Sequence, residues 1–368
     1  MGEPFRQKLP NRLHSNRRKV CGRSELNAQN DAAFVFEEAI TAGDLLVNVL
    51  ITGAAGFIGQ ALARRILARG FLGTASVSTI ALLDTSFPHT SETTNAVRHV
   101  RGSLADRDLV RTSWGEGFDV IFHLASIPGG AAEQNYELSR DVNINGTMGL
   151  LEAAKAQTER DGRKAKVVFA STIAVFGSPL PSVVDDGSAV NPKMTYASQK
   201  LIGETLVADF SRRGWLDGRS LRLAGVLARP PAKTGQLSGF MSDMIRELGQ
   251  RRSFVCPMSP GATTWAASIH NVVDNLIHAA ALDEPAAASH RTITLPALRF
   301  SMEELVDAIA RVHGDDIRGL VRYEPNPLLE DLFGRFPALR TPSAEKLGFQ
   351  GDGDVATLVR RAIEDVDI

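Results

Sequence analysis

Short apolar runs rich in β-branched residues alternate with helical patterns from Val47 onward. Several of these runs are apolar at every position rather than at alternate ones, as expected for a sheet that is covered on both faces. Strand–helix–strand repetition requires parallel pairing with right-handed crossovers, so the sequence predicts an α/β fold with a doubly wound parallel sheet. The predicted strands are residues 47–52, 77–84, 96–103, 119–125, 166–172 and 219–225.

The pattern of the chain changes at Arg229-Pro230-Pro231, where prolines interrupt the alternation. Residues 47–228 are therefore predicted to form the sheet domain. Residues 229–368 are predicted to form a smaller lobe that binds substrate, with a late strand at 292–296 returning to the sheet. Residues 1–46 show no sustained apolar periodicity before Phe34 and are predicted to be a disordered extension.

Composition narrows the class of protein. A chain of 368 residues with 43% apolar residues can bury a core without disulfides or a structural metal. Its two cysteines, Cys21 and Cys256, exclude a disulfide framework and favour a reducing, cytoplasmic compartment. No apolar run approaches the roughly 20 residues that span a bilayer, so we expect no membrane association.

Charge is unevenly distributed along the chain. The first 23 residues carry seven of the 41 Lys and Arg residues but one acid, Glu3, of the 42 Asp and Glu, which leaves the remainder at a net charge of −7. The body therefore offers no general nucleic-acid surface. The basic head resembles a mitochondrial presequence in composition. It also fits a nucleic-acid arm or residues added by an upstream start codon, and we favour plain disorder.

The first predicted strand runs directly into a glycine-rich turn with the spacing G-x-x-G-x-x-G. Gly53, Gly56 and Gly59 would allow a tight turn, close approach of a diphosphate and packing of the next helix on the strand. The free N–H groups at the start of that helix would bind the diphosphate. No Lys-Ser/Thr follows, which excludes a nucleoside-triphosphate P-loop. The candidate cofactor residues of this turn are Gly53, Ala55, Gly56, Phe57, Ile58 and Gly59.

Asp84 ends the second predicted strand, 25 residues after Gly59. A carboxylate there can accept hydrogen bonds from both adenosine ribose hydroxyls and would repel a 2′-phosphate. Thr85 and Ser86 follow, with no arginine nearby to bind that phosphate, so NAD is favoured over NADP. The alternative is that Asp84 merely caps a turn.

Tyr196 and Lys200 lie four residues apart in Y-A-S-Q-K and therefore on one face of a helix. Ser171 and Thr172 end the fifth predicted strand, 24 residues before Tyr196. Active sites of doubly wound sheets are built at such strand ends, so these four side chains are the candidate catalytic group.

The ordered motifs of residues 47–229 resemble the extended short-chain dehydrogenase/reductase family, which includes nucleotide-sugar epimerases and dehydratases. They are T-G-A-A-G-F-I-G, Asp84, H-L-A-S, V-N-I-N-G-T, F-A-S-T-I-A-V-F-G and Y-A-S-Q-K. Further stretches extend the resemblance to dehydrogenases of small sugar acids: 132–140, S-P-L-P-S-V-V, D-F-S-R-R-G-W-L-D-G-R-S-L-R-L and V-C-P-M-S-P. Ser103 departs from the family pattern, which usually has an aspartate near the adenine.

The resemblance implies a Rossmann fold, NAD as cofactor and a homodimer formed through helices at 145–158 and 196–212. It also implies further cofactor contacts at Leu104, Leu124, Ala125 and Asn143, besides Tyr196 and Lys200. The substrate contacts it suggests are Glu133, Thr172, Tyr196, Arg229 and Ser238. Arg229 follows the sixth predicted strand, where its planar guanidinium could bind a substrate carboxylate. The alternative for Arg229 is a surface ion pair or an anchor for the proline turn.

In this family Tyr196 would remove the substrate hydroxyl proton while hydride leaves for the nicotinamide. A tyrosine with pKa about 10 is a poor base at pH 7. A lysine about 4 Å away, at an effective dielectric near 20, contributes about 4 kcal/mol, or roughly three pKa units. Lys200 would also bind the nicotinamide ribose, and Thr172 or Ser171 would hold the reacting oxygen.

Four other residues have side chains that could serve a functional site. His123 has no second ligand at metal spacing, so we expect it to pack at a strand end and line the nucleotide cleft, with no metal site. Cys256 lacks a nearby base in sequence and is predicted to be a core or pocket-wall residue. Trp265 and Phe240 fit either the substrate pocket or the core.

Three functions therefore remain open. The first is an NAD-dependent dehydrogenase of a small sugar acid, and the second is a nucleotide-sugar 4-epimerase with the same side chains that returns the hydride. The third is a non-catalytic NAD-binding protein, because fold does not fix function. The intact Thr172, Tyr196 and Lys200 set argues against the third, since a binder needs no basic phenol.

Overall fold

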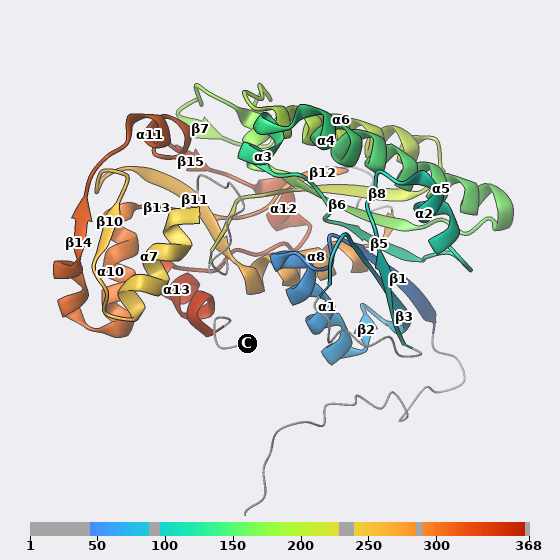
Figure 1. Cartoon of the computed structure of the whole chain (residues 1–368), viewed down its shortest axis with the longest axis horizontal. Coiled ribbons are helices and arrows are strands. Elements are labelled where there is room, and N and C mark those ends of the chain that lie inside the picture. Colours follow the sequence, from blue (N-terminus) through green and yellow to red (C-terminus); the bar gives the residue numbers. More distant parts are fainter. Residues whose placement is uncertain (1–44, 88–95, 228–238, 285–289, 365–368) are drawn as a thin grey trace, which may run out of the picture. The chain divides into compact units, whose positions relative to one another are not determined.

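The central sheet orders its strands as β12-β8-β6-β5-β1-β3-β2, with β4 also paired to β3. Every pairing is parallel except that of the short β2 with β3. The computed structural model describes residues 45–87, 96–227, 239–284 and 290–364. The predicted doubly wound α/β fold is confirmed (Figure 1). The strands are β1 (Leu46–Thr52), β2 (Phe71–Leu72), β3 (Ala75–Asp84), β4 (Val97–Arg101), β5 (Val120–His123), β6 (Lys166–Thr172), β8 (Asp217–Leu223) and β12 (Thr292–Thr294).

Helices cover both faces of this sheet, which explains why its strands are apolar throughout. In β1, Val49 and Ile51 enter one core cluster together with side chains of α1, and Leu50 enters a second cluster with side chains of α5. Successive residues of a strand point to opposite faces, so both sets must be apolar. The first face carries α1 (Phe57–Arg69) and α8 (Ile269–Ala281), and the second carries α2 (Arg107–Ser113), α5 (Thr147–Asp161) and α6 (Thr195–Arg212).

The sixth predicted strand, 219–225, is two strands in the structure. β8 ends at Leu223 in the central sheet, and β9 (Gly225–Leu227) begins a separate sheet with β11 (Thr263–Ser268) and β13 (Leu298–Ser301). The backbones approach closely there, since a Cβ on Gly225 would lie 3.2 Å from the Trp265 carbonyl oxygen. The sequence pattern of 219–225 therefore does not reveal that the chain changes sheets.

The segment after residue 238 contributes to both parts of the fold. α8 packs on the central sheet, and β12, which lies within the predicted late strand 292–296, pairs with β8. A second core forms around Leu248, Phe300 and Ile309. The elements there are α7 (Phe240–Gly249), β10 (Phe254–Cys256), α10 (Met302–His313), a 3₁₀ helix (Asp315–Leu320), β14 (Val321–Tyr323), α11 (Pro327–Phe333), α12 (Pro342–Lys346) and α13 (Val355–Glu364).

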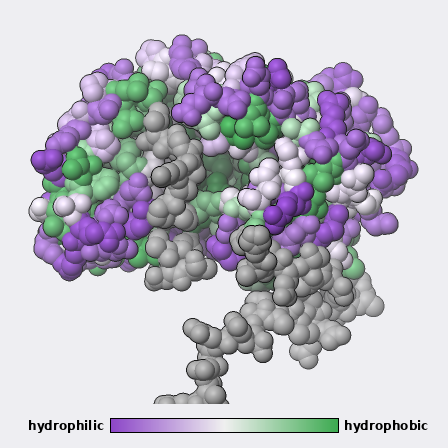
Figure 2. Space-filling model, viewed as in Figure 1, coloured by the Kyte–Doolittle hydropathy of each residue, from purple (hydrophilic) through white to green (hydrophobic). Residues whose placement is uncertain are grey.

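Short elements follow strands β5 and β6 in the chain, and two of them, at 129–134 and 173–176, contribute residues to the wall of the cavity described below. They are α3 (Gly129–Gln134), α4 (Tyr136–Arg140), a π-helix (Asp141–Gly146), a 3₁₀ helix (Ile173–Phe176), and β7 (Val183–Val184), which pairs with β15 (Ala338–Leu339). Hydrophilic residues cover most of the face in Figure 2, and hydrophobic residues line a recess near its centre. Among the described helices, none has the length and apolar character needed to cross a membrane.

Candidate active site

The glycine-rich turn between β1 and α1 has the close backbone contacts that its spacing predicts. Gly53 has φ +70°, and a Cβ there would lie 2.7 Å from the Ala125 nitrogen. A Cβ on Gly59 would lie 2.2 Å from the Gly53 carbonyl oxygen. α1 then begins at Phe57, and no side chain caps it at Gly56. The N-terminus of a helix favours binding of a phosphate. The turn therefore fits the diphosphate of a dinucleotide.

Asp84 lies at the end of β3 against this turn. One carboxylate oxygen accepts a hydrogen bond from the Ala55 N–H at 3.0 Å, and the other accepts from the Thr85 N–H at 2.7 Å. The carboxylate therefore stabilises the turn by hydrogen bonds, at the strand end where a ribose would bind. Leu104 is buried beside Gly146, whereas Leu124 follows β5 in the cavity wall and Ala125 donates its N–H to Thr52 Oγ1 at 3.3 Å.

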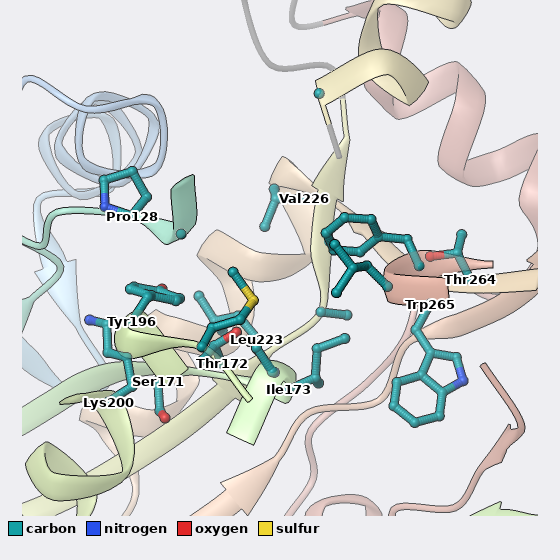
Figure 3. A pocket seen from close by; sticks show the side chains of 18 of the residues that line it. Pro128, Ser171, Thr172, Ile173, Tyr196, Lys200, Leu223, Val226, Thr264 and Trp265 are labelled. Atoms are coloured by element: carbon teal, nitrogen blue, oxygen red, sulfur yellow. Dashed lines mark hydrogen bonds between the residues drawn. The ribbon is translucent and has the colours of Figure 1, made fainter. Parts of the chain in front are cut away.

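A cavity of about 550 Å³ joins the glycine-rich turn to the four candidate catalytic residues. Tyr196 and Lys200 line it from α6, and Ser171 and Thr172 line it from the end of β6 (Figure 3). The Lys200 ammonium lies 5.7 Å from the centre of the Tyr196 ring and 4.7 Å from the centre of the Phe169 ring. The fold thus brings together residues that the sequence separates by up to 147 positions, from Gly53 to Lys200.

The two neighbouring hydroxyls of β6 have different partners. Ser171 is 2% exposed and donates its hydroxyl proton to Glu204 at 2.5 Å. Thr172 Oγ1 accepts the Ala174 N–H at 3.2 Å and donates its proton to no acceptor within the described chain. In Figure 3 the Thr172 side chain lies on the Tyr196 side, and the Ser171 hydroxyl points away. Thr172 is therefore better placed to donate to a substrate oxygen.

Glu204 and Arg222 lie behind the candidate catalytic residues and were not predicted from the sequence. Glu204 lies one turn beyond Lys200 on α6 and is 4% exposed. It accepts two hydrogen bonds from Arg222 of β8, at 3.0 and 2.8 Å. The spacing of residues 196, 200 and 204 places all three on one helix face and could have pointed to Glu204. However, an acid eight residues after a tyrosine is common on helices, so the spacing alone does not single it out.

Lys200 is an unusual lysine because it is almost completely buried. Burial lowers its pKa to about 7, and the negative charge of Glu204 opposes that shift. Ionisation of Lys200 therefore falls in the physiological range, which is typical of groups in active sites.

His123 lies beneath the cavity rather than in its wall. It is 0% exposed, and its two ring nitrogens lie 2.8 Å from Thr52 Oγ1 and 2.8 Å from Thr147 Oγ1. Burial, and then the charge of Lys200, lower the pKa of His123 to about 3, so the ring is neutral. The expectation that it lines the nucleotide cleft is wrong because both hydroxyls enclose it. Within the described residues, no cluster of three His, Cys, Asp or Glu could hold a metal.

Asn143 holds the site together rather than facing the cavity. Its side-chain oxygen Oδ1 accepts the Ile127 N–H at 2.7 Å, and its side-chain Nδ2 donates to the Ile127 carbonyl oxygen and to Gln199 Oε1. It therefore connects the loop after β5 to α6. A direct contact of Asn143 with the cofactor stays a prediction.

The predicted substrate residues have different positions. Glu133 accepts the Thr195 N–H at 2.5 Å, at the start of α6, and does not line the cavity within the described chain. Arg229 and Ser238 lie outside the described residues. Trp265 lines the cavity and stacks on Phe336 at 4.7 Å.

Two further predictions concern residues of the second core. Phe240 packs on that core, and it is not among the described residues that line the cavity. Cys256 is buried in the same core, as predicted.

Comparison with known proteins agrees with this geometry. The family model described as "NAD dependent epimerase/dehydratase family" matches residues 49–289. D-erythronate dehydrogenase of Cupriavidus necator is 35% identical over 327 residues, 88% of this chain and 99% of that protein. The D-erythronate dehydrogenase of Haemophilus influenzae is 30% identical, covering 86% of this chain and 99% of that protein.

A solved structure is also similar over nearly the whole fold. The nucleoside-diphosphate-sugar epimerase from Agrobacterium tumefaciens superposes with a TM-score of 0.83 and 32% identity, covering 89% of this chain and 97% of the other. Together with the glycine-rich turn and the Thr172, Tyr196 and Lys200 group, these matches show that the chain belongs to the NAD-dependent epimerase/dehydratase family.

Proposed function

We propose that the protein is an NAD-dependent dehydrogenase that oxidises the C2 hydroxyl of a small sugar acid, D-erythronate, to 2-dehydro-D-erythronate. One observation carries the proposal: Thr172, Tyr196 and Lys200 line the same cavity as the glycine-rich turn. The two relatives named D-erythronate dehydrogenase support the choice of substrate.

In the proposed reaction Tyr196 removes the proton of the C2 hydroxyl as a C=O bond forms. The glycine-rich turn and Asp84 would hold NAD, which would supply the acceptor for the hydride that leaves C2. Lys200 in its charged form favours the phenolate of Tyr196 through Coulomb attraction. Thr172 donates a hydrogen bond to the reacting oxygen, and Ser171, whose proton is directed to Glu204, does not.

The substrate carboxylate requires a cation or several hydrogen-bond donors. Arg229, at the start of the undescribed segment, remains our first candidate. Among the described wall residues, Lys193 and Arg335 are the other cations near solvent, and Arg335 already pairs with Asp331 at 3.3 Å. Arg229→Met should raise KM for the acid by ten- to a hundredfold, the cost of a charged hydrogen bond, while leaving the Kd of NAD unchanged. An unchanged KM, or the same rise in Arg335→Met instead, would remove Arg229 from this role.

A nucleotide-sugar 4-epimerase is the second candidate, because it would use the same three side chains. The similarity to the epimerase from Agrobacterium tumefaciens favours it. Incubation of the protein with NAD and either D-erythronate or UDP-galactose distinguishes the two. With D-erythronate and NAD we expect NADH to accumulate, on the order of one NADH per acid oxidised, as measured by absorbance at 340 nm. With UDP-galactose and NAD we expect no NADH. Conversion of UDP-galactose without net NADH would overturn the sugar-acid proposal.

We also propose a homodimer formed through the α5–α6 face. Ile202 of α6 is 42% exposed, and Tyr136 and Leu138 of the adjoining α4 are 57% and 46% exposed. Exposed large apolar side chains on adjoining helices are typical of a protein interface.

A further inference from the structure

Three titratable side chains form one row along α6, which runs from the cavity wall into the interior of the fold. Tyr196, Lys200 and Glu204 are spaced by four residues, so they lie one above another on a single helix face. Lys200 is 3% exposed and Glu204 is 4% exposed. The row therefore leads from the candidate base at the cavity wall to a carboxylate inside the fold.

The Glu204 carboxylate is fixed from two strands. Ser171 of β6 donates to Oε1 at 2.5 Å, and Arg222 of β8 donates to Oε1 at 3.0 Å and to Oε2 at 2.8 Å. The Arg222 guanidinium also lies 5.1 Å from the centre of the Phe176 ring. Three donors on one carboxylate leave it little freedom to rotate.

A buried ion pair of this kind contributes little to folding stability. Removing two charges from water costs several kcal/mol, and their mutual attraction often only balances that cost. Stability alone therefore gives no strong reason for Glu204 and Arg222 to be charged. Their position next to Lys200 and Ser171 suggests a role in the reaction.

Lys200 needs a nearby negative charge to remain protonated. The titratable groups packed around it are Tyr196 and Glu204 on α6 and His123 on β5, with Arg222 on β8 behind Glu204. His123 is neutral and so does not stabilise the ammonium of Lys200. Glu204 is the carboxylate whose charge opposes the effect of burial on Lys200. Without that charge, burial would favour the neutral amine.

We propose that Glu204, fixed by Arg222, is a positioning residue that holds Lys200 in its charged form and directs the Ser171 hydroxyl away from the substrate. The proposal rests on the proposed function for its catalytic consequence. A charged Lys200 is what makes the Tyr196 phenolate accessible near neutral pH.

The test measures the pKa of Lys200 directly by ¹³C NMR of the full-length protein labelled with [¹³C]lysine. The Lys200 signal is assigned by its loss in Lys200→Met. Two variants remove the charge of Glu204: Glu204→Gln, and the double variant Glu204→Gln/Arg222→Met, which leaves no unpaired buried charge. Asp217→Asn is the matched control, because Asp217 pairs with Arg219 and Arg291 at the opposite end of the same strand β8.

We expect both Glu204 variants to lower the pKa of Lys200 by about one unit, the usual effect of losing a nearby opposite charge. A parallel fall of about fivefold in kcat at pH 7, with KM for the acid unchanged, should accompany it, because lowering the Lys200 pKa from about 7 by one unit reduces the charged fraction at pH 7 from about one half to about one tenth. Glu204→Asp, which keeps the charge, should restore most of both. Asp217→Asn should lower the melting temperature without moving the Lys200 signal.

An unchanged Lys200 pKa in a folded Glu204 variant would overturn the proposal, as would an equal shift in Asp217→Asn. Because this titration needs no substrate, it can fail while D-erythronate is still oxidised. Equally, it can succeed while the substrate assignment fails.

Discussion

At the scale of single residues, neighbouring side chains of the same type have different surroundings. Ser171 and Thr172 are consecutive residues with hydroxyl side chains. Ser171 donates to the buried Glu204 carboxylate, whereas the Thr172 hydroxyl lies on the cavity side and can donate to a substrate. Residue type alone could not choose between them, because side chains alternate across a strand and the partner of Ser171, Glu204, comes from α6.

Tyr196→Phe tests the proposed base. The substitution keeps the ring and removes the hydroxyl, so kcat for oxidation of D-erythronate should fall by at least the 10²–10⁴-fold that general acid–base catalysis provides. The Kd of NAD should change little. Tyr323→Phe, on β14, is the control and should keep normal turnover. Near-normal kcat in the Tyr196 variant would show that another group is the base.

His123 predicts how stability depends on pH. Its pKa is about 3 in the folded protein and about 6.5 when unfolded, so the unfolded chain binds the extra proton between these values. The contribution of neutral His123 to the free energy of unfolding is therefore complete above about pH 6.5, and it is lost as the pH falls toward 3. We expect His123 to account for a loss of about 2 kcal/mol in the free energy of unfolding between pH 7 and pH 5, measured by urea unfolding at each pH. His123→Gln should lack that component, and equal slopes in both proteins would contradict the burial argument.

At the scale of elements, the position of α1 depends on glycines and that of α6 on a distant carboxylate. A Cβ on Gly59 would meet the Gly53 carbonyl at 2.2 Å, so α1 approaches the turn only because no side chain is present. α6 has no side-chain cap at Met194, and Glu133 of α3 accepts the Thr195 N–H there. A carboxylate at a helix N-terminus is favourable, so Glu133 stabilises the helix that carries Tyr196.

Gly59→Ala should displace α1 from the turn. Because the obstructing atoms are backbone, we expect a loss of about 1–3 kcal/mol in unfolding free energy and a large rise in the Kd of NAD. Gly149→Ala in α5 is the matched control, since its nearest neighbour, Arg107 Cγ, would lie 3.8 Å away. That variant should gain about 0.5–1 kcal/mol. Calorimetry and NAD titration check both, and tight NAD binding by the Gly59 variant would refute the packing argument.

Asp84 at the end of β3 should determine the choice of nucleotide. Asp84→Asn keeps an acceptor for the Ala55 N–H but removes the charge that repels a 2′-phosphate. The ratio of kcat/KM for NAD to that for NADP should fall by about tenfold or more, corresponding to about 1.4 kcal/mol of charge repulsion. If the ratio stays constant, the ribose contact lies elsewhere.

At the scale of the described molecule, the cavity depends on both sheets. Its wall includes Thr172 and Leu223 from the central sheet and Thr264 and Trp265 from the second sheet (Figure 3). The Trp265 indole is fixed by a hydrogen bond to the Pro337 carbonyl at 2.8 Å and by stacking on Phe336. We therefore expect substrate selection to depend on the second sheet as well as on the glycine-rich turn.

The proposed dimer is tested by adding charge to the α5–α6 face. Ile202→Glu should convert a dimer to a monomer, because a carboxylate cannot be buried unpaired at an apolar interface. Leu328→Glu on α11 is the control, since Leu328 is 62% exposed in a different part of the fold. Light scattering after gel filtration measures both masses. A dimer that persists in Ile202→Glu would place the interface elsewhere.

Much of the fold and the outline of the site were predictable from local sequence. The strand at 166–172 coincides with β6, and the glycine spacing, Asp84 and the Tyr196–Lys200 pair lie where the pattern placed them. These features are local, because glycine conformation, strand apolarity and helix periodicity are properties of a few consecutive residues.

Tertiary structure alone decided which of these residues touch. The separation of β8 from β9, the enclosure of His123 by two threonines and the pairing of Glu204 with Arg222 all depend on segments that are distant in sequence. Burial and hydrogen-bond partners are set by packing between elements, and so are the pKa values that follow from them. The sequence by itself therefore determined the fold class and the candidate residues, and packing decided the chemical state of each.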